Sequence, residues 1–194
     1  MTYLLQALLL LGAVYLASRY NRLVALRERF RNGFAQIDVQ LKRRHDLIPN
    51  LVETARGYMA HERETLEGVI QARNRAIQAG GEAAAHPGMP VAMLGLTSAE
   101  QSLSGALTHF FGLAEGYPEL KASETMRKLQ EELASTENRI AFARQAFNDA
   151  VMRYNATRGG FPTNLVASAF RFDEAAFFRL DDEGERNVPG ASFG

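Results

Sequence analysis

Hydrophobic residues recur at steps of three and four along most of this chain, and that spacing constrains its fold more than any other feature. Such a pattern follows one face of an α-helix, whereas the alternation typical of strands is almost absent. The two longest runs are Leu23, Leu26, Phe30, Phe34, Ile37, Leu41, Ile48, Leu51 and Ala55, and Met126, Leu129, Leu133, Ile140, Ala143, Phe147, Ala150 and Tyr154. The sequence therefore predicts an all-α fold.

Glycines mark the ends of four predicted helices. The glycines that follow a periodic run, as a helix C-cap does, are Gly57, Gly80 with Gly81, Gly116, and Gly159 with Gly160. Before the third helix, Thr97 and Glu100 have the spacing of an N-terminal capping box, and Ser123 can cap the fourth helix. We predict long helices at 20–57 and 123–157, short helices at 61–79 and 97–115, and a linker at about 80–96. This order is typical of an antiparallel up-down four-helix bundle.

Pro49 lies inside the first long helix and conflicts with this prediction. A proline there removes one backbone hydrogen bond and is expected to kink or end the helix. Asp46 is the residue that could cap a new helix at this point. A second alternative is that Gly57 lies within a helix, which would join the first two helices into one rod.

The N-terminal segment Tyr3–Ala17 is apolar except for Gln6. It is shorter than the roughly 20 residues that cross a bilayer, but residues 1–20 reach that length. A cleaved signal peptide is disfavoured because no Lys or Arg precedes the run and no small-x-small pair follows it. A core helix is disfavoured because the segment is apolar on every face. We therefore predict a transmembrane anchor at residues 1–19, followed by the helical bundle at 20–160.

Basic residues after the apolar run predict the orientation of this anchor. They are Arg19, Arg22, Arg27, Arg29 and Arg31. The positive-inside rule then places the N-terminus outside and the bundle in the cytoplasm. Arg19, Arg22 and Arg27 are also candidates for contact with anionic lipid headgroups, although their role as a topology signal is enough to explain them.

Composition excludes several classes of function. The chain has 22 basic and 22 acidic residues, so it lacks the positive surplus that nucleic-acid binding needs. It contains no cysteine, which excludes disulfides, thiolate metal sites and thiol nucleophiles.

Motifs for catalysis or metal binding are also incomplete. His61 and Glu62 begin like the zinc-protease pattern H-E-x-x-H, but Thr65 stands where the second histidine belongs. The di-iron pattern, the phosphate loop and the nucleophile elbow are absent from the sequence. We therefore predict no catalytic, metal or cofactor site, and a protein that is not an enzyme.

The densest group of polar residues is predicted to lie between the two long helices. Its members are Gln40, Arg43, Arg44, Glu132, Thr136, Glu137 and Arg139. Arg44 falls on the apolar seam, and antiparallel alignment places it near Glu132 and Thr136, with Gln40 nearer Glu137 and Arg139. A salt-bridged layer that sets the helix register is the favoured interpretation. A polar ligand or partner site is the alternative.

The chain ends in an aromatic segment at residues 161–194, which the bundle returns to the membrane side. Its large apolar residues are Phe161, Leu165, Val166, Phe170, Phe172, Phe177 and Phe178. They predict either an interfacial amphipathic helix beside the anchor or a segment that packs on the bundle end or a neighbouring subunit. The polar tail Asp181–Gly194 is predicted to be extended.

Several blocks of this sequence resemble the LemA family of bacterial membrane proteins. They are Tyr20–Phe30, Gln36–Tyr58, His61–Arg73, Thr136–Asn155 and Phe161–Ala167. The resemblance implies a bacterial source, an N-terminal transmembrane helix and a soluble helical bundle, but no defined activity. Family members often occur beside membrane zinc metalloproteases, and magnetosome proteins include a relative. By analogy, these associations suggest envelope maintenance or scaffolding.

The favoured function is therefore a non-enzymatic scaffold or adaptor, anchored by a single pass in the bacterial inner (cytoplasmic) membrane. We expect it to act as a homo-oligomer and through contacts with other envelope proteins. The alternative is an accessory subunit of a membrane zinc metalloprotease in envelope quality control. A third hypothesis is an enzyme that uses the region of Arg44 and Glu137.

Overall fold

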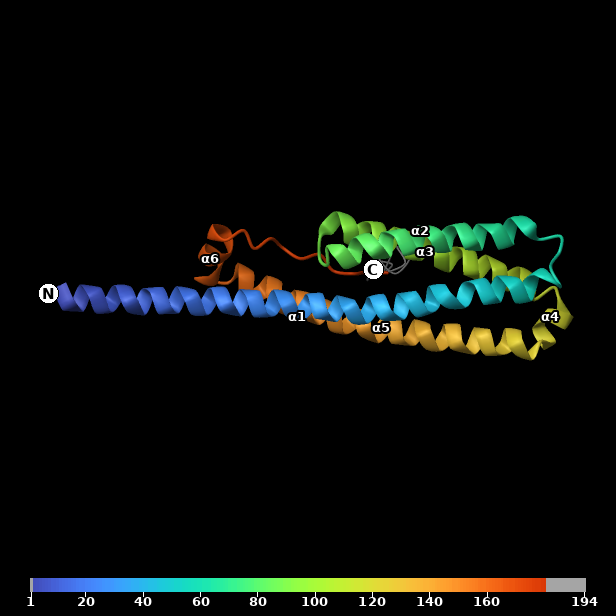
Figure 1. The fold of residues 1–194 in the computed structure, drawn as a ribbon, viewed down its shortest axis with the longest axis horizontal. Helices are drawn as coiled ribbons and strands as arrows, with labels where there is room; N and C mark the ends of the chain where they lie inside the picture. The colour runs from blue at the N-terminus through green and yellow to red at the C-terminus, as the bar shows by residue number, and fades with distance from the viewer. Residues whose placement is uncertain (1, 181–194) are drawn as a thin grey trace, which may run out of the picture.

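The computed structural model describes residues 2–180, and its regular elements are all helical (Figure 1). They are α1 (Thr2–Arg56), α2 (Arg63–Ala85), α3 (Pro90–Ala114), α4 (Pro118–Ala122), α5 (Glu124–Gly159) and α6 (Thr163–Ala169). Helices α1, α2, α3 and α5 alternate in direction, with α1 packed against α5 and α2 against α3. The predicted all-α fold is confirmed, with α4 and α6 as additional short helices.

The N-terminal part of α1 projects alone beyond the bundle (Figure 1). Among the described residues, α1 is the one helix long and apolar enough to cross a membrane, and its apolar window is 0% buried within the chain. Exposed leucines in water are unfavourable at about 25 cal/mol per Å² of apolar surface. The segment therefore suggests a single-pass membrane anchor.

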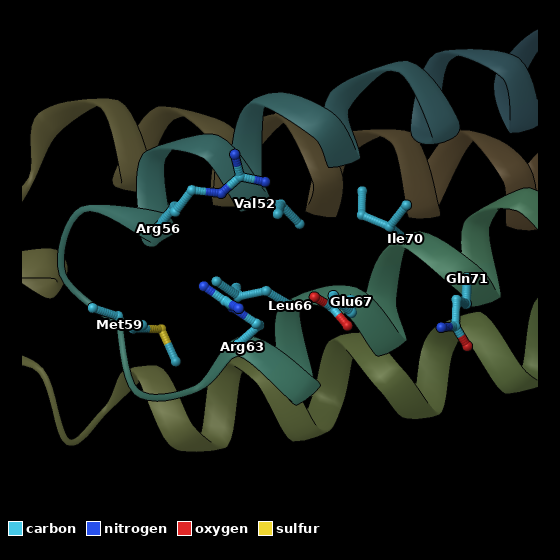
Figure 2. Close-up of a pocket in the computed structure, with 9 residues that line it drawn as sticks. Val52, Arg56, Met59, Arg63, Leu66, Glu67, Ile70 and Gln71 are labelled. Atoms are coloured by element: carbon cyan, nitrogen blue, oxygen red, sulfur yellow. The ribbon is translucent and has the colours of Figure 1, made fainter.

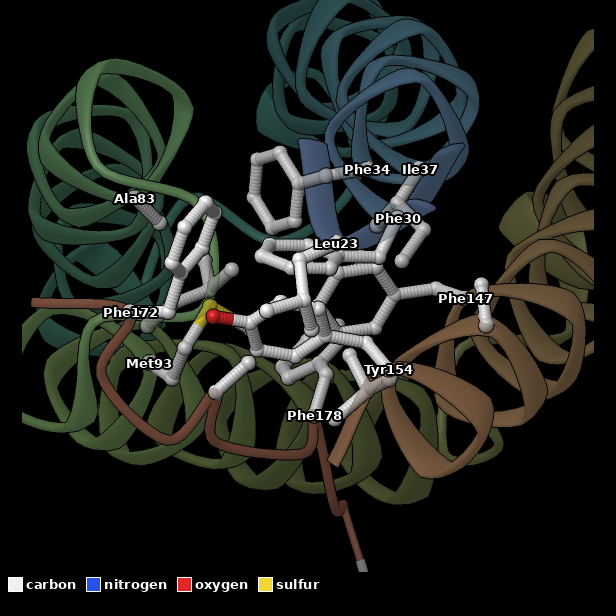
Figure 3. Packing of buried hydrophobic residues seen from close by; sticks show 14 of the residues in the cluster. Leu23, Phe30, Phe34, Ile37, Ala83, Met93, Phe147, Tyr154, Phe172 and Phe178 are labelled. Carbon is white, nitrogen blue, oxygen red and sulfur yellow. The ribbon is translucent and has the colours of Figure 1, made fainter. Parts of the chain in front are cut away.

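Two hydrophobic cores follow one another along the bundle. The core at the α6 end includes Leu23, Phe30, Phe34, Phe147, Tyr154, Phe172 and Phe178, with aromatic rings packed edge to face (Figure 3). The core at the α4 end includes Ile48, Leu51, Met59, Val69, Leu103, Phe110 and Met126. In each of α1, α3 and α5, buried polar residues lie between the residues of one core and those of the other.

Helix α1 continues through Pro49, and another donor replaces the backbone hydrogen bond that proline cannot form. The amide that proline lacks would have bonded the carbonyl of His45, four residues earlier. Arg73 of α2 instead donates from Nε to the His45 carbonyl oxygen at 2.6 Å. Ile48 and Leu51, on either side of Pro49, are buried and hold the helix against the bundle. The expected break at Pro49 is therefore absent.

Helix α1 ends at Arg56, so the first two helices are separate, as the glycine at position 57 predicted. The predicted linker at 80–96 is wrong, because most of its residues are helical. Gly80 lies inside α2 on the same face as Ala76 and Ala83, and all three are buried. A Cβ at Gly80 would meet no atom within 4 Å, so packing does not require glycine there, and the contacts of α2 with α3 sustain the helix in spite of the low helix propensity of glycine.

The turn between α2 and α3 is confined to residues 86–89, and α3 begins at Pro90. Gly88 has a φ of 81°, a conformation that glycine adopts at little cost. Thr97 and Glu100 consequently lie within α3 and form no capping box. Ser123 does cap α5, since its Oγ accepts a hydrogen bond from the Met126 amide at 3.4 Å.

Residues 170–180 turn back from α6 and run along the bundle in an extended conformation (Figure 1). Phe172 and Phe178 enter the core at the α6 end, together with Ala175. Of the two alternatives for this segment, these two phenylalanines follow packing on the bundle and not the membrane contact, because the core at the α6 end buries their side chains. The predicted extended tail Asp181–Gly194 lies outside the described residues.

Candidate functional site

Three charged or ionisable side chains meet in the middle of the bundle. Glu100 of α3 is 0% exposed and accepts a hydrogen bond from Arg44 Nη1 at 3.0 Å. Its other carboxylate oxygen lies 2.8 Å from Nε2 of His45. Arg44 also donates from Nη2 to Ser104 Oγ at 2.9 Å. Buried charges are tolerated only when paired and hydrogen-bonded in this way.

The other predicted members of the polar layer lie around this cluster. Glu137 lies 3.5 Å from Arg44 Nη1, and half of its side chain is exposed. Arg43 and Glu132 approach to 3.9 Å on the surface. Thr136 is buried and donates to the Glu132 carbonyl within its own helix. The antiparallel register thus brings Arg44 to Glu137 rather than to Glu132, one turn from the predicted pairing.

Gln40 and Arg139 do not join the cluster. Gln40 Oε1 is buried and has no hydrogen-bond partner among the described residues. Arg139 is exposed on α5.

A groove opens beside Arg44 between α3 and α5, with a volume of about 540 Å³. It is lined by Arg44, Ser104, Leu107, Thr108, Phe111, Gln130, Leu133, Ala134 and Glu137. The Arg44 guanidinium at its floor is already bonded to Glu100 and Ser104, so displacing these partners would oppose the binding of an anion. The geometry favours the register-setting interpretation over a ligand site.

Glu100 is the main residue that the sequence analysis missed. Its spacing after Thr97 suggested a capping box, but it is also four residues after Leu96 and three before Leu103, which are both buried. A charged residue on an apolar face predicts a buried partner, and the same signal applies to His45 beside Arg44.

The aromatic residues of the C-terminal segment divide between surface and core. Phe161, Leu165 and Phe170 are 83%, 61% and 62% exposed, whereas Val166 faces the bundle. Phe177 is partly buried. Leu165 belongs to α6 and the other two flank it, and α6 lies beside α1 at the base of its projecting part (Figure 1).

The arginines at this end differ in their surroundings. Arg22 is exposed, and Arg19 lies over the Tyr15 ring at 4.6 Å. Arg27 stacks on the Phe172 ring at 5.0 Å and lies 3.7 Å from Glu28. Arg27 therefore belongs partly to the bundle, whereas Arg22 is exposed and Arg19 is partly buried.

Side chains of α5 hold the extended segment by its main chain. Asn155 and Asn148 each bond both the amide and the carbonyl of one residue, Ala175 and Phe178 respectively, at 2.8 to 3.0 Å. The Tyr154 hydroxyl donates to the Asp173 carbonyl at 2.8 Å, and burial raises the pKa of this tyrosine. The segment is thus an integral part of the bundle.

Two further surfaces are candidates for binding. At the α4 end, a groove of about 610 Å³ lies between α1 and α2 (Figure 2). Its lining residues are Val52, Arg56, Met59, Ala60, Arg63, Leu66, Glu67, Ile70 and Gln71. At the other end of α2 and α3, Met89, Val91 and Leu94 are at least half exposed, beside a groove of about 560 Å³. Both grooves are lined by apolar and by charged or ionisable side chains.

Across residues 2–180, no three His, Asp or Glu side chains gather in a way that could hold a metal ion. The candidate surfaces of this part of the chain are therefore apolar faces and a paired polar layer.

Comparison with known proteins gives the same family as the sequence blocks. The profile of the LemA family matches residues 33–193. Magnetosome protein MamQ of Magnetospirillum gryphiswaldense is 24% identical over 191 residues, covering 89% of this chain and 69% of the relative. Protein LemA of Metamycoplasma hominis is 26% identical over 182 residues, covering 93% of this chain and 78% of the relative.

Proposed function

Because this chain belongs to the LemA family, we propose that it is a scaffold or adaptor of the bacterial envelope that acts by self-association and protein contacts, without catalysis. The proposed place is the inner membrane, crossed once by the N-terminal part of α1, with the bundle in the cytoplasm. The arginines that follow the apolar run support this orientation.

The proposal of self-association rests on a cluster of exposed apolar side chains at the start of α3. Val91 and Leu94 are 75% and 71% exposed, and they lie one helical turn apart on α3. Met89 adjoins them at the turn before α3. A cluster of large exposed apolar side chains is typical of a protein interface. A second copy of the chain offers the same face, as symmetric association requires.

The test is the mass of the detergent-extracted, full-length protein by light scattering, with detergent subtracted. We expect a mass several times the 21.5 kDa of one chain. The double variant Val91→Ser and Leu94→Ser is expected to lower that mass. Phe142→Ser on α5 is the matched control, because Phe142 is 74% exposed and lies on a different helix.

A mass near that of one chain for the unmodified protein would contradict self-association. It would favour the second candidate, an accessory subunit of a membrane zinc metalloprotease. The open groove of mixed charge between α1 and α2 supports this candidate, since it can receive an extended polypeptide (Figure 2). Protease activity that is unchanged when this protein is deleted would exclude it.

A further inference from the structure

Helix α6 turns one face to the bundle and the other away from it. Thr163, Val166 and Ala167 are buried against the bundle. Phe161 and Leu165, four residues apart, point outward with Phe170 at the end of the helix, and all three are exposed. The described residues leave most of the surface of these three side chains uncovered.

The position of α6 along α1 suggests what covers them. The Phe170 ring packs edge-on against Tyr20 with centroids 4.9 Å apart. The roughly 20 residues that span the hydrocarbon reach from the start of α1 to about Tyr20. Phe170 therefore lies at the level where the membrane-spanning part of α1 ends. Tyrosine is itself enriched at this interface.

Basic residues outnumber acidic ones around α6, where the acidic side chains Asp173 and Glu174 follow Arg171 and Phe172. Arg19, Arg22, Arg158 and Arg171 lie at this end of the bundle, on α1, on α5 and directly after α6. The sequence contains no Asp or Glu in residues 2–27 or 150–172. Anionic headgroups would complement this charge at about 1 kcal/mol per arginine near the surface.

From these observations we propose that α6 is a second membrane contact, which inserts Phe161, Leu165 and Phe170 into the anionic leaflet beside the anchor. The arginines around it contact the phosphate groups of lipids. The contact rests on the proposed membrane anchor and adds to it, because two attachment points fix the tilt of the bundle on the bilayer.

Tryptophan fluorescence tests this contact, because the chain contains no tryptophan. The full-length protein is reconstituted into bilayers of phosphatidylglycerol and phosphatidylcholine whose acyl chains carry bromine, which quenches tryptophan on contact. Leu165→Trp reports on α6, and Leu10→Trp reports on the anchor. Phe142→Trp is the control on α5, exposed to a similar degree but roughly 24 Å further along the helix than Arg158.

We expect Leu165→Trp and Leu10→Trp to lose at least roughly half of their emission, as for side chains about 5 to 10 Å inside the acyl boundary. Phe142→Trp is expected to lose little. The loss for Leu165→Trp is expected to fall when phosphatidylglycerol is omitted, or when Arg22→Gln and Arg171→Gln remove two of the charges.

A quenched Leu10→Trp with an unquenched Leu165→Trp would overturn the α6 contact and leave the anchor intact. If that unquenched emission were also shifted to the blue, a protein would cover α6 instead of lipid. Unquenched emission from both variants would refute the anchor together with the inference that rests on it. Equal quenching of Leu165→Trp with and without phosphatidylglycerol would overturn the role given to the arginines.

Discussion

At the scale of single residues, Pro49 and Arg73 show how one helix supplies what another lacks. Proline removes the donor for the His45 carbonyl, and the Arg73 guanidinium replaces it at 2.6 Å. The compensation comes from a residue on α2 that the sequence places far from Pro49. It also ties α2 to α1 at the height of the polar layer.

This interpretation predicts that Arg73 and Pro49 are coupled in a double-mutant cycle. Arg73→Met should lower the free energy of unfolding by about 2 kcal/mol, because the His45 carbonyl loses a charged donor. In a Pro49→Ala background, the new amide bonds that carbonyl, so the same change should cost about 1 kcal/mol less. Chemical denaturation followed by circular dichroism measures both values.

Arg75→Met is the control for this cycle, since Arg75 is an exposed arginine on the same helix. It should cost little in either background. An equal cost of Arg73→Met with proline or alanine at position 49 would show that the two residues do not compensate each other.

We expect substitution of Glu100 to destabilise the fold more than any other single polar substitution. Glu100→Ala leaves Arg44 with only Ser104 and the half-exposed Glu137, and leaves His45 without its carboxylate partner. Breaking a buried ion pair from one side costs about 3 to 5 kcal/mol. Thermal unfolding should therefore show a strongly lowered midpoint.

Glu132→Ala is the matched control, because its pair with Arg43 is half exposed and 3.9 Å long. Surface pairs of this kind contribute about 0 to 1 kcal/mol. Similar losses for Glu100→Ala and Glu132→Ala would contradict the role of Glu100 in the core.

At the scale of elements, residues 172–180 form an extended segment that packs along the helices and belongs to no β-sheet. Side chains of α5 bond several of their main-chain groups, the Ala176 amide donates to the Gly88 carbonyl at 2.8 Å, and the Phe172 amide donates to the Ala167 carbonyl at 2.9 Å. An extended segment buried without such partners would leave unpaired peptide groups, which are costly. The segment thereby joins the α2–α3 turn to α5.

Asn155→Ala is predicted to loosen this segment without unfolding the helices. It removes both bonds to Ala175, at about 1 kcal/mol each. Hydrogen exchange should quicken at the amides of Ala175 and Ala176, while amides in the middle of α5 remain protected. Asn138→Ala, at an exposed asparagine of the same helix, is the control. Unchanged exchange at Ala175 would contradict the role of Asn155.

At the scale of the whole molecule, the two ends of the bundle have different chemistry. The α6 end carries the projecting apolar helix, exposed phenylalanines and unbalanced arginines, whereas the α4 end is a helical connection beside an open groove. The part of α1 from Tyr20 to Arg56 measures roughly 55 Å at 1.5 Å per residue. The groove at the α4 end therefore lies far from the level of Tyr20.

The orientation of the molecule is testable with single cysteines, because the chain has none of its own. Ala60→Cys lies at the α4 end and is exposed. A maleimide that does not cross membranes should label it only after cells are lysed, since the positive-inside rule places the bundle in the cytoplasm. Thr2→Cys, at the other end of α1, should be labelled in intact spheroplasts. Labelling of Ala60→Cys before lysis would reverse the proposed topology.

Periodicity in the sequence predicted the four main helices, although not their full lengths, and most of their buried residues. Leu23, Phe34, Ile48, Ile140 and Phe147 were expected on apolar faces and are buried. The spacing of side chains along a helix is local, so it can be read without knowing what the helix packs against. The same reasoning located Arg44 on the seam between the long helices.

Only the tertiary structure decided which residues pack against these apolar helix faces. Gly80 resembles a helix end, yet α2 continues to Ala85 because it packs on α3, and Glu100 resembles a cap until Arg44 and His45 are opposite it. Phe172 and Phe178 have the composition of a membrane-facing segment, yet they fill the core because α5 holds their main chain. Local pattern determined the helices of this protein, whereas contacts between residues distant in sequence determined its turns, its polar layer and its C-terminal segment.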